Sequence, residues 1–285
     1  MTERKTNLIG EVETVALAID GSDFNNGAVQ EAIFLCKACG AKLIVVHVIA
    51  IDSGAATQVH SSSSFMRTMT KTYISNIFKM ANNSGIDSEL VIEDSYQPDK
   101  TIVEIAHKHK ADVIIMGRHG KKGLLNLLVG SMTAKVIGRR FPQVLVVPKD
   151  FTIGGKKILL ATDGSESILA AAEEIKSLSL HCSAPEEIYV LSVATKEPGI
   201  EEARQRADLM CERMKEKETD TITYIPMASV GRPSEVIAAT AMEKDIDMII
   251  IGGHGTGLGK LLMGHVTEKV IGRAHCAVLV LEKKK

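Results

Sequence analysis

The chain has 285 residues, of which 45% are hydrophobic, and its 34 basic and 35 acidic residues nearly cancel. This length suits two domains of about 100–150 residues, and the balanced charge provides no long-range field for nucleic acid or an anionic membrane. No run of about 18 apolar residues occurs, and the first dozen residues lack the apolar core of a signal peptide. We therefore expect a cytoplasmic protein with no nucleic-acid partner and no membrane partner.

The sequence contains an internal repeat. Residues 14–22, TVALAIDGS, correspond to residues 157–165, KILLATDGS. Residues 130–148, GSMTAKVIGRRFPQVLVVP, correspond to residues 264–282, GHVTEKVIGRAHCAVLVLE. The chain is therefore predicted to hold two copies of one domain, residues 1–150 and 151–285, joined near the polar, glycine-containing segment 149–157.

Strand and helix signals alternate along each copy. In chain order, the first copy is predicted to contain strands at 13–20, 42–50, 88–93, 112–117 and 143–148, and helices from Ala28 to Cys39, around 66–80, from Pro98, and over 130–140. The Ser-rich segment 54–65 is predicted to be a loop. The second copy is predicted to have strands near 157–162, 187–194, 221–227, 247–251 and 277–281.

This alternation predicts an α/β fold made of two tandem doubly wound domains. Each would have a five-stranded parallel sheet of order 3-2-1-4-5 with helices on both faces. The last strand of each copy is an apolar edge, and an unpaired apolar edge is a liability. We expect the last strands of the two halves to pair, which makes the chain a pseudo-dimer; a homodimer of two chains stays open.

Ligands bind such sheets past the carboxyl ends of strands 1 and 4. In the first copy these ends are residues 20–22, Asp-Gly-Ser, and residues 116–120, Met-Gly-Arg-His-Gly. The second of these loops runs to Gly130 and Ser131 at the start of a helix, where free N–H groups favour phosphate. The Asp20 carboxylate suits ribose hydroxyls or the edge of a base. A simple turn with a helix cap is the alternative reading of Asp-Gly-Ser.

Two other kinds of site are not supported by the sequence. Neither the P-loop pattern nor the G-x-G-x-x-G dinucleotide pattern is present. Five cysteines at irregular positions argue against a disulfide framework. Cys36 and Cys39 form a C-x-x-C, but the helical pattern around them predicts buried helix residues more than a redox or metal pair.

The loop spacing resembles that of the universal stress protein family, whose nucleotide loop reads G-2x-G-9x-G-[ST]. The first half has Gly117, two residues, Gly120, nine residues (121–129) and then Gly130-Ser131. The resemblance covers nearly the whole chain and implies ATP as the ligand, with Mg²⁺ or Mn²⁺ as an optional companion, although no carboxylate pair indicates a metal site. The implied first-half contacts are Asp20, Gly21, Val48, Met116, Gly117, Arg118, His119, Gly120, Gly130, Ser131 and Met132.

The second half departs from this pattern. Only eight residues (256–263) separate its second and third glycines, and His265 stands where Ser or Thr is expected. The shorter loop is expected to change where the last glycine falls, so the first half is expected to hold the better ATP site. The second-half positions implied by the resemblance are Asp163, Val193, Gly252, Gly255, Gly264 and His265.

The resemblance implies an ATP-binding regulatory protein of the stress response, whose nucleotide occupancy changes its partners or its oligomeric state. A slow ATPase or phosphotransferase is a second hypothesis, for which His119 is the best candidate base, but the chain has no Walker-type lysine. A nucleotide-independent interaction scaffold is a third. The sequence favours holding ATP over cleaving it.

Overall fold

The computed structural model describes residues 12–22, 25–51, 62–118, 129–165, 168, 185–215, 222–254 and 263–282, with the side chains of the helix around residue 70 described from residue 72. Its helices are α1 (Asn26–Cys39), α2 (Ser62–Asn83), α3 (Pro98–Lys108), α4 (Ser131–Gly138), α6 (Ile200–Met214), α7 (Pro233–Glu243) and α8 (His265–Arg273). A short 3₁₀ turn, Glu197–Gly199, precedes α6. Because α2 begins at Ser62, the last four residues of the predicted Ser-rich loop are helical; residues 54–61 lie outside the described part.

The described strands alternate with these helices. In the first half they are β1 (Thr14–Ala18), β2 (Lys42–Ala50), β3 (Ser88–Ser95), β4 (Val113–Gly117) and β5 (Gln143–Val147). In the second half they are β6 (Lys157–Ala161), β7 (Glu187–Ala194), β8 (Thr223–Val230), β9 (Met248–Gly252) and β10 (Ala277–Leu281). The predicted α/β class is therefore confirmed.

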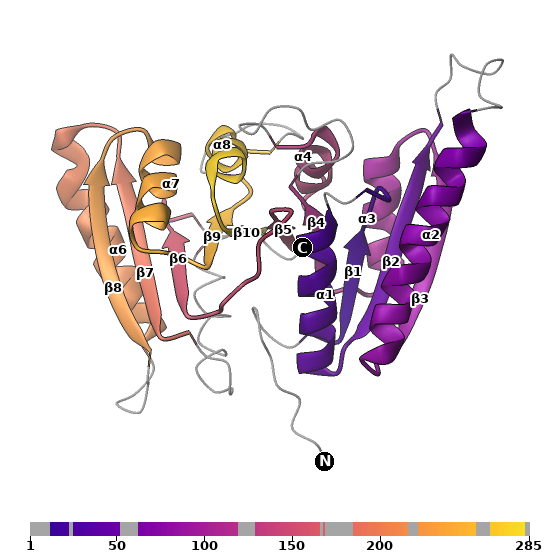
Figure 1. Ribbon diagram of the computed structural model, residues 1–285. Coiled ribbons are helices and arrows are strands. Elements are labelled where there is room, and N and C mark those ends of the chain that lie inside the picture. The colour runs from indigo at the N-terminus through magenta and orange to yellow at the C-terminus, as the bar shows by residue number, and fades with distance from the viewer. Residues whose placement is uncertain are drawn as a thin grey trace.

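All ten strands form one sheet, in the order β3-β2-β1-β4-β5-β10-β9-β6-β7-β8. Read from its outer edge toward the centre, each half has the predicted order 3-2-1-4-5, and its internal pairs are parallel. In Figure 1 the outer strands of the two halves stand on either side of β5 and β10. Strands 1 and 4 are neighbours in both halves, and their carboxyl ends mark the point where sheets of this order bind ligands.

The two halves join through their last strands, as predicted. β5 and β10 pair antiparallel, with Leu145 opposite Leu279 at the middle of the contact. All five residues of each strand are buried. Because the two paired strands are equivalent and run antiparallel, the contact relates the two halves by a local two-fold axis.

Each face of the sheet is covered by helices from both halves. One core contains residues of α1, α2 and α6 with one face of the strands, and the other contains residues of α3, α4, α7 and α8 with the opposite face. Both cores run through β5 and β10 without a break, because residues of those strands belong to each. The central strands β5 and β10 are consequently buried throughout, whereas every residue of the outermost strand β3 is partly buried or exposed.

Local sequence explains where several helices begin and end. α1 stops at Gly40, which takes φ 67° in the left-handed region that glycine adopts without strain. α3 and α7 each begin on a proline, Pro98 and Pro233, whose missing N–H costs nothing in the first turn. Cys36 and Cys39 lie buried in α1, and burial raises the pKa of Cys36 to about 12. A thiol with that pKa stays protonated at neutral pH, which supports a packing role.

An aspartate just before strand 4 of each half holds the start of strand 1. Asp247 Oδ2 accepts hydrogen bonds from the N–H groups of Lys156 (2.8 Å) and Lys157 (2.9 Å), and its Oδ1 accepts one from Gly154 (3.1 Å). Asp112 accepts equivalent bonds from Glu13 and Thr14 in the first half. Asp247 thereby anchors the segment that connects the two halves.

Asp247→Ala is expected to lower the free energy of unfolding by about 1–2 kcal/mol, because three N–H groups lose their acceptor at once. Asp208→Ala is the matched control, since Asp208 is exposed on α6 and its loss is expected to cost less than about 0.5 kcal/mol. Urea unfolding followed by circular dichroism measures both. Equal midpoints for the two variants would show that the anchor contributes nothing.

Candidate functional site

The end of strand 1 forms the same tight turn in both halves. Gly21 and Gly164 have φ 77° and 76°, a backbone that only glycine adopts readily. In the second half, Asp163 Oδ1 accepts a hydrogen bond from Ser165 N at 2.9 Å. The turn brings the exposed Asp163 carboxylate to the carboxyl end of β6, beside the crevice.

Asp20 makes more bonds inside this turn than its counterpart does. Its Oδ1 accepts hydrogen bonds from Ser22 N (3.0 Å), Ser22 Oγ (2.6 Å) and Asn25 Nδ2 (2.6 Å). The turn in the alternative reading of Asp-Gly-Ser is therefore confirmed, whereas the residue that caps α1 is Asn25, which makes no side-chain capping bond. Among the described residues, Asp163 accepts fewer local bonds than Asp20, although the sequence favoured the first half.

A set of hydrogen bonds, here called the clasp, joins the start of the last helix to the end of strand 4 in the second half. Gly264 N donates to Gly253 O at 2.8 Å, and Gly253 N donates to Leu281 O at 3.0 Å. The Thr267 hydroxyl donates to Gly252 O at 2.7 Å. Gly264 caps α8 with φ −59° and ψ 137°. These bonds fix the first turn of α8 directly over the carboxyl end of β9.

The first half has the same clasp with nearly the same geometry. Gly130 N donates to Arg118 O at 2.8 Å, and the Thr133 hydroxyl donates to Gly117 O at 3.0 Å. Gly130 caps α4 with φ −59° and ψ 138°. The expectation that the shorter loop displaces the last glycine is therefore wrong, because the clasp holds Gly264 as it holds Gly130. The one-residue difference falls between the clasped ends, outside the described residues.

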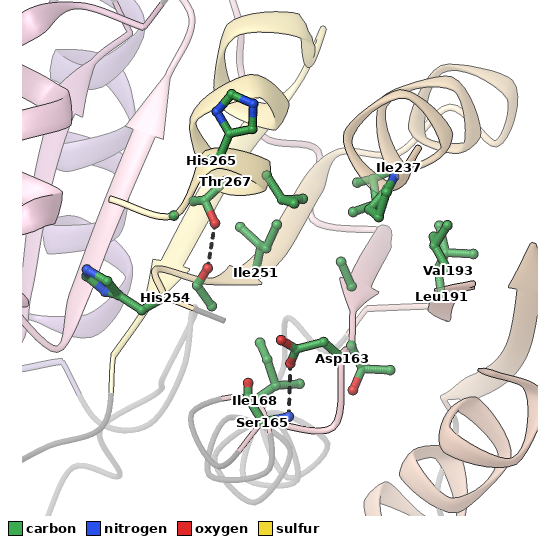
Figure 2. A pocket seen from close by; sticks show the side chains of 16 residues that line it. Asp163, Ser165, Ile168, Leu191, Val193, Ile237, Ile251, His254, His265 and Thr267 are labelled. Carbon is green, nitrogen blue, oxygen red and sulfur yellow. Dashed lines mark hydrogen bonds between the residues drawn. The ribbon is translucent and has the colours of Figure 1, made fainter. Parts of the chain in front are cut away.

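A cavity of about 310 Å³ lies in the crevice of the second half. Five of the six predicted second-half residues line it, namely Asp163, Val193, Gly252, Gly264 and His265. Figure 2 shows Asp163 facing the cavity from the end of β6, His265 and Thr267 standing on α8, and Ile237 on α7. The sixth residue, Gly255, lies outside the described residues. The residues predicted from the loop pattern thus come together around one hollow.

The cavity has an apolar wall and a polar rim. Its wall includes four buried side chains, Ile168, Leu191, Ile237 and Ile251. At its polar end, the buried hydroxyl of Ser165 has no hydrogen-bond partner. The N–H groups in the first turn of α8 have no acceptor within the helix. This arrangement can bind a flat apolar group at one end and an anion at the other.

Sequence reasoning missed some of the lining residues. Ile251 and Val266 occupy the positions of Met116 and Met132, which the resemblance had singled out in the first half, so transferring them along the repeat would have found both. Thr267 repeats Thr133 at the same position, and its hydroxyl contact is not visible in a sequence. Pro233 and Ile237 enter the cavity from α7, whose distance from the loop along the chain hides them.

Comparison with known proteins matches the universal stress protein family model at residues 11–148 and again at residues 155–282. The chain belongs to the universal stress protein family. A universal stress protein of Synechocystis, Slr1230, is 23% identical and covers 94% of this chain and 99% of its own length. MJ0531 of Methanocaldococcus jannaschii is 32% identical over 47% of this chain and 81% of its own length. A crystal structure of a universal stress protein from Archaeoglobus fulgidus superposes with a TM-score of 0.70 at 18% identity, covering 95% and 98% of the two chains.

The universal stress positions of the first half differ in where the structure places them. The Arg118 guanidinium reaches the second half, where Nη1 donates to Ala274 O at 2.6 Å. Met116 is buried in the core beneath α3 and α4, and Val48 is half-buried against the same core. His119 and Gly120 lie outside the described residues, so their predicted roles stay predictions. Ser131 is exposed in the first turn of α4, as His265 is in α8.

His254 follows strand 4 in the second half, as His119 does in the first. Its Nδ1 is hydrogen-bonded to Glu282 Oε1, and its Nε2 is buried without a partner. In Figure 2 the ring points away from Asp163 and Ile251. Its backbone therefore lines the cavity while the ring packs beside the central strands, which does not suit a base acting on a ligand in the cavity.

Thr267→Val is expected to destabilise the protein by about 1 kcal/mol, because the Gly252 carbonyl loses its donor while the shape of the side chain is kept. Thr267→Ser retains the hydroxyl and is expected to unfold closer to the parent. The free energy of unfolding in urea distinguishes the two variants. If the valine and serine variants were equally destabilised, the hydroxyl contact would not be what stabilises this position.

Proposed function

We propose that the chain binds ATP in both halves and acts as a nucleotide-dependent regulatory protein of the stress response. The observation that supports this most directly is the cavity lined by Asp163, Val193, Gly252, Gly264 and His265. Its volume of about 310 Å³ falls at the lower end of the range for ligand sites, about 300–1,000 Å³. Such a size suits a nucleoside, with the phosphates extending to the polar rim.

The chemistry of the cavity suggests how the nucleotide lies. The adenine ring would pack against Leu191 and Ile237, which both contribute to the apolar wall. The ribose hydroxyls would face the Asp163 carboxylate. The phosphates would accept hydrogen bonds from the first N–H groups of α8 and from His265. Gly264, without a side chain, leaves the phosphates close access to that backbone.

The first half is proposed to bind ATP in the same way. Its clasp repeats the geometry of the second half, and Gly117, Gly130 and Ser131 occupy the positions of Gly252, Gly264 and His265. If Mg²⁺ or Mn²⁺ accompanies the nucleotide, the phosphates would be its main ligands. Among the described residues, no group of three potential metal-binding side chains occurs. Binding without dedicated hydrolysis is the simplest role for these groups, and the cytoplasmic location stays a prediction.

Within the described part of the chain, no helix is long and apolar enough to cross a membrane. The first experiment is a calorimetric titration of the full chain with ATP, with GTP as the comparison. Saturable heat with ATP and weaker binding of GTP are expected, because the apolar wall and the Asp163 region accommodate adenine by shape. The absence of ATP binding at millimolar ligand would contradict the proposal.

A further inference from the structure

Arg118 connects the nucleotide loop of the first half to the second half. The backbone of Arg118 joins the two ends of that loop, because the Arg118 carbonyl accepts a hydrogen bond from Gly130 N. The Arg118 N–H donates to Val147 O at 3.1 Å. Its side chain crosses the central strands and donates from Nη1 to Ala274 O at 2.6 Å. One residue thus belongs to the loop clasp of one half and to the helix end of the other.

Ala274 is the residue that ends α8. Its N–H donates to Val270 O, and its own carbonyl faces Arg118. A cation at the C-terminal end of a helix stabilises the negative end of the helix dipole. The other end of the same helix is His265, which lines the second cavity. α8 is nine residues long, so about 13 Å of rigid helix separates the Arg118 contact from that cavity.

The Arg118 contact is partly buried. Among the described residues, no group accepts a hydrogen bond from the buried guanidinium Nε, and burial lowers the pKa of the guanidinium from its ordinary value. A charge-assisted bond in such a place is stronger than one at the surface, and it is lost at a cost if the group moves. The guanidinium therefore has one favourable position, which depends on where the loop clasp holds the Arg118 backbone.

The reciprocal position in the second half is Gly253, which has no side chain to reach α4. The backbone bonds of Gly253 match those of Arg118, but only Arg118 has a side chain that reaches the other half. We propose that Arg118 couples nucleotide binding in the two halves, with α8 as the connecting element. This inference rests on the proposed ATP sites and concerns how they communicate.

The direction of coupling follows from the clasp. A nucleotide in the first half would contact Gly117, which precedes Arg118 in the chain, and Gly130, which bonds to Arg118 in the clasp. It would thereby hold the Arg118 backbone where its side chain reaches Ala274. The bond to Ala274 O then holds the C-terminal end of α8, while the clasp at Gly264 and Thr267 holds the first turn that faces the second cavity. Binding in one half is therefore expected to strengthen binding in the other, by about fivefold or more.

The test compares single-site proteins with the parent by calorimetry. Met132→Trp blocks the first site without touching the clasp, since Met132 occupies the position of Val266, which lines the second cavity. Gly252→Leu blocks the second cavity, which Gly252 lines. If the sites are coupled, the product of the two ATP dissociation constants of the parent is smaller than the product of the two single-site constants. The same three measurements are then repeated in an Arg118→Gln background.

In the Arg118→Gln background the two products are expected to agree within about twofold. Any direct effect of Arg118 on the first site cancels, because the single-site constants are measured in the same background. Arg118→Lys still donates one bond to Ala274 O and is expected to keep part of the coupling. Independent sites in the parent, negative coupling, or coupling of equal size after Arg118→Gln would overturn the inference. Failure of the parent to bind ATP would instead contradict the proposed function, and thermal unfolding confirms that each variant is folded.

Discussion

Gly252→Leu is expected to lower the ATP affinity of the second half by about tenfold or more, while Gly252→Ala keeps binding. A Cβ added at Gly252 would sit 3.6 Å from His254 O and 3.6 Å from Ile168 Cγ1, which is ordinary contact, so alanine fits. Ile168 lines the same cavity, so the rest of a leucine side chain would extend into the space proposed for the nucleoside. A loss of tenfold corresponds to about 1.4 kcal/mol of binding free energy.

The measurement is a calorimetric titration in the Met132→Trp background, where only the second half can bind. Gly252→Ala is the matched control because it changes the same residue without filling the cavity. Melting temperatures of the three proteins should differ little, since neither side chain meets a close backbone atom at its Cβ. Tight binding by the leucine variant would mean that the nucleotide lies elsewhere.

Leu279→Ala is expected to destabilise the whole chain by about 2–5 kcal/mol. Leu279 is fully buried on β10, and its partner Leu145 on β5 is 1% exposed. Both belong to the core that runs through the two halves. Removing this side chain leaves a cavity at the junction, so the loss affects the contact between the halves as well as the second domain.

The control for this change is Leu209→Ala, which removes the same atoms from an exposed position on α6, where Leu209 is 49% exposed. Its expected cost is less than about 0.5 kcal/mol. Urea unfolding of both variants gives the comparison. Similar stabilities for the two would show that the β5–β10 contact contributes little, in conflict with the continuous core.

The fold could be predicted closely from the sequence because its signals are local or repeated. The apolar runs at 42–50 and 143–148 predicted buried strands, and the repeat fixed which strands are equivalent. The pairing of the last strands followed from their apolar edges and was confirmed by the β5–β10 ladder. The start of α2 at Ser62 was missed because serines at a helix start resemble a loop when no tertiary contact is known.

The candidate site was predicted less completely, for physical reasons. Counting loop residues suggested that the second half is distorted, yet hydrogen bonds at both ends of the loop hold Gly264 in place whatever the loop length. The family resemblance implied Arg118 as a nucleotide contact; its guanidinium binds Ala274 on the other half, and a contact through its backbone stays a prediction. A side chain that crosses a junction between repeats is invisible to a motif that lies within one repeat.

The most direct test of two ATP sites in one universal stress protein is a crystal structure of the full chain grown with ATP. We predict density for adenine against Leu191 and Ile237 and for phosphates at the first turn of α8, with a second nucleotide at Gly130 and Ser131. Both crevices empty at saturating ATP, or a nucleotide bound away from Gly252 and Gly264, would contradict this account.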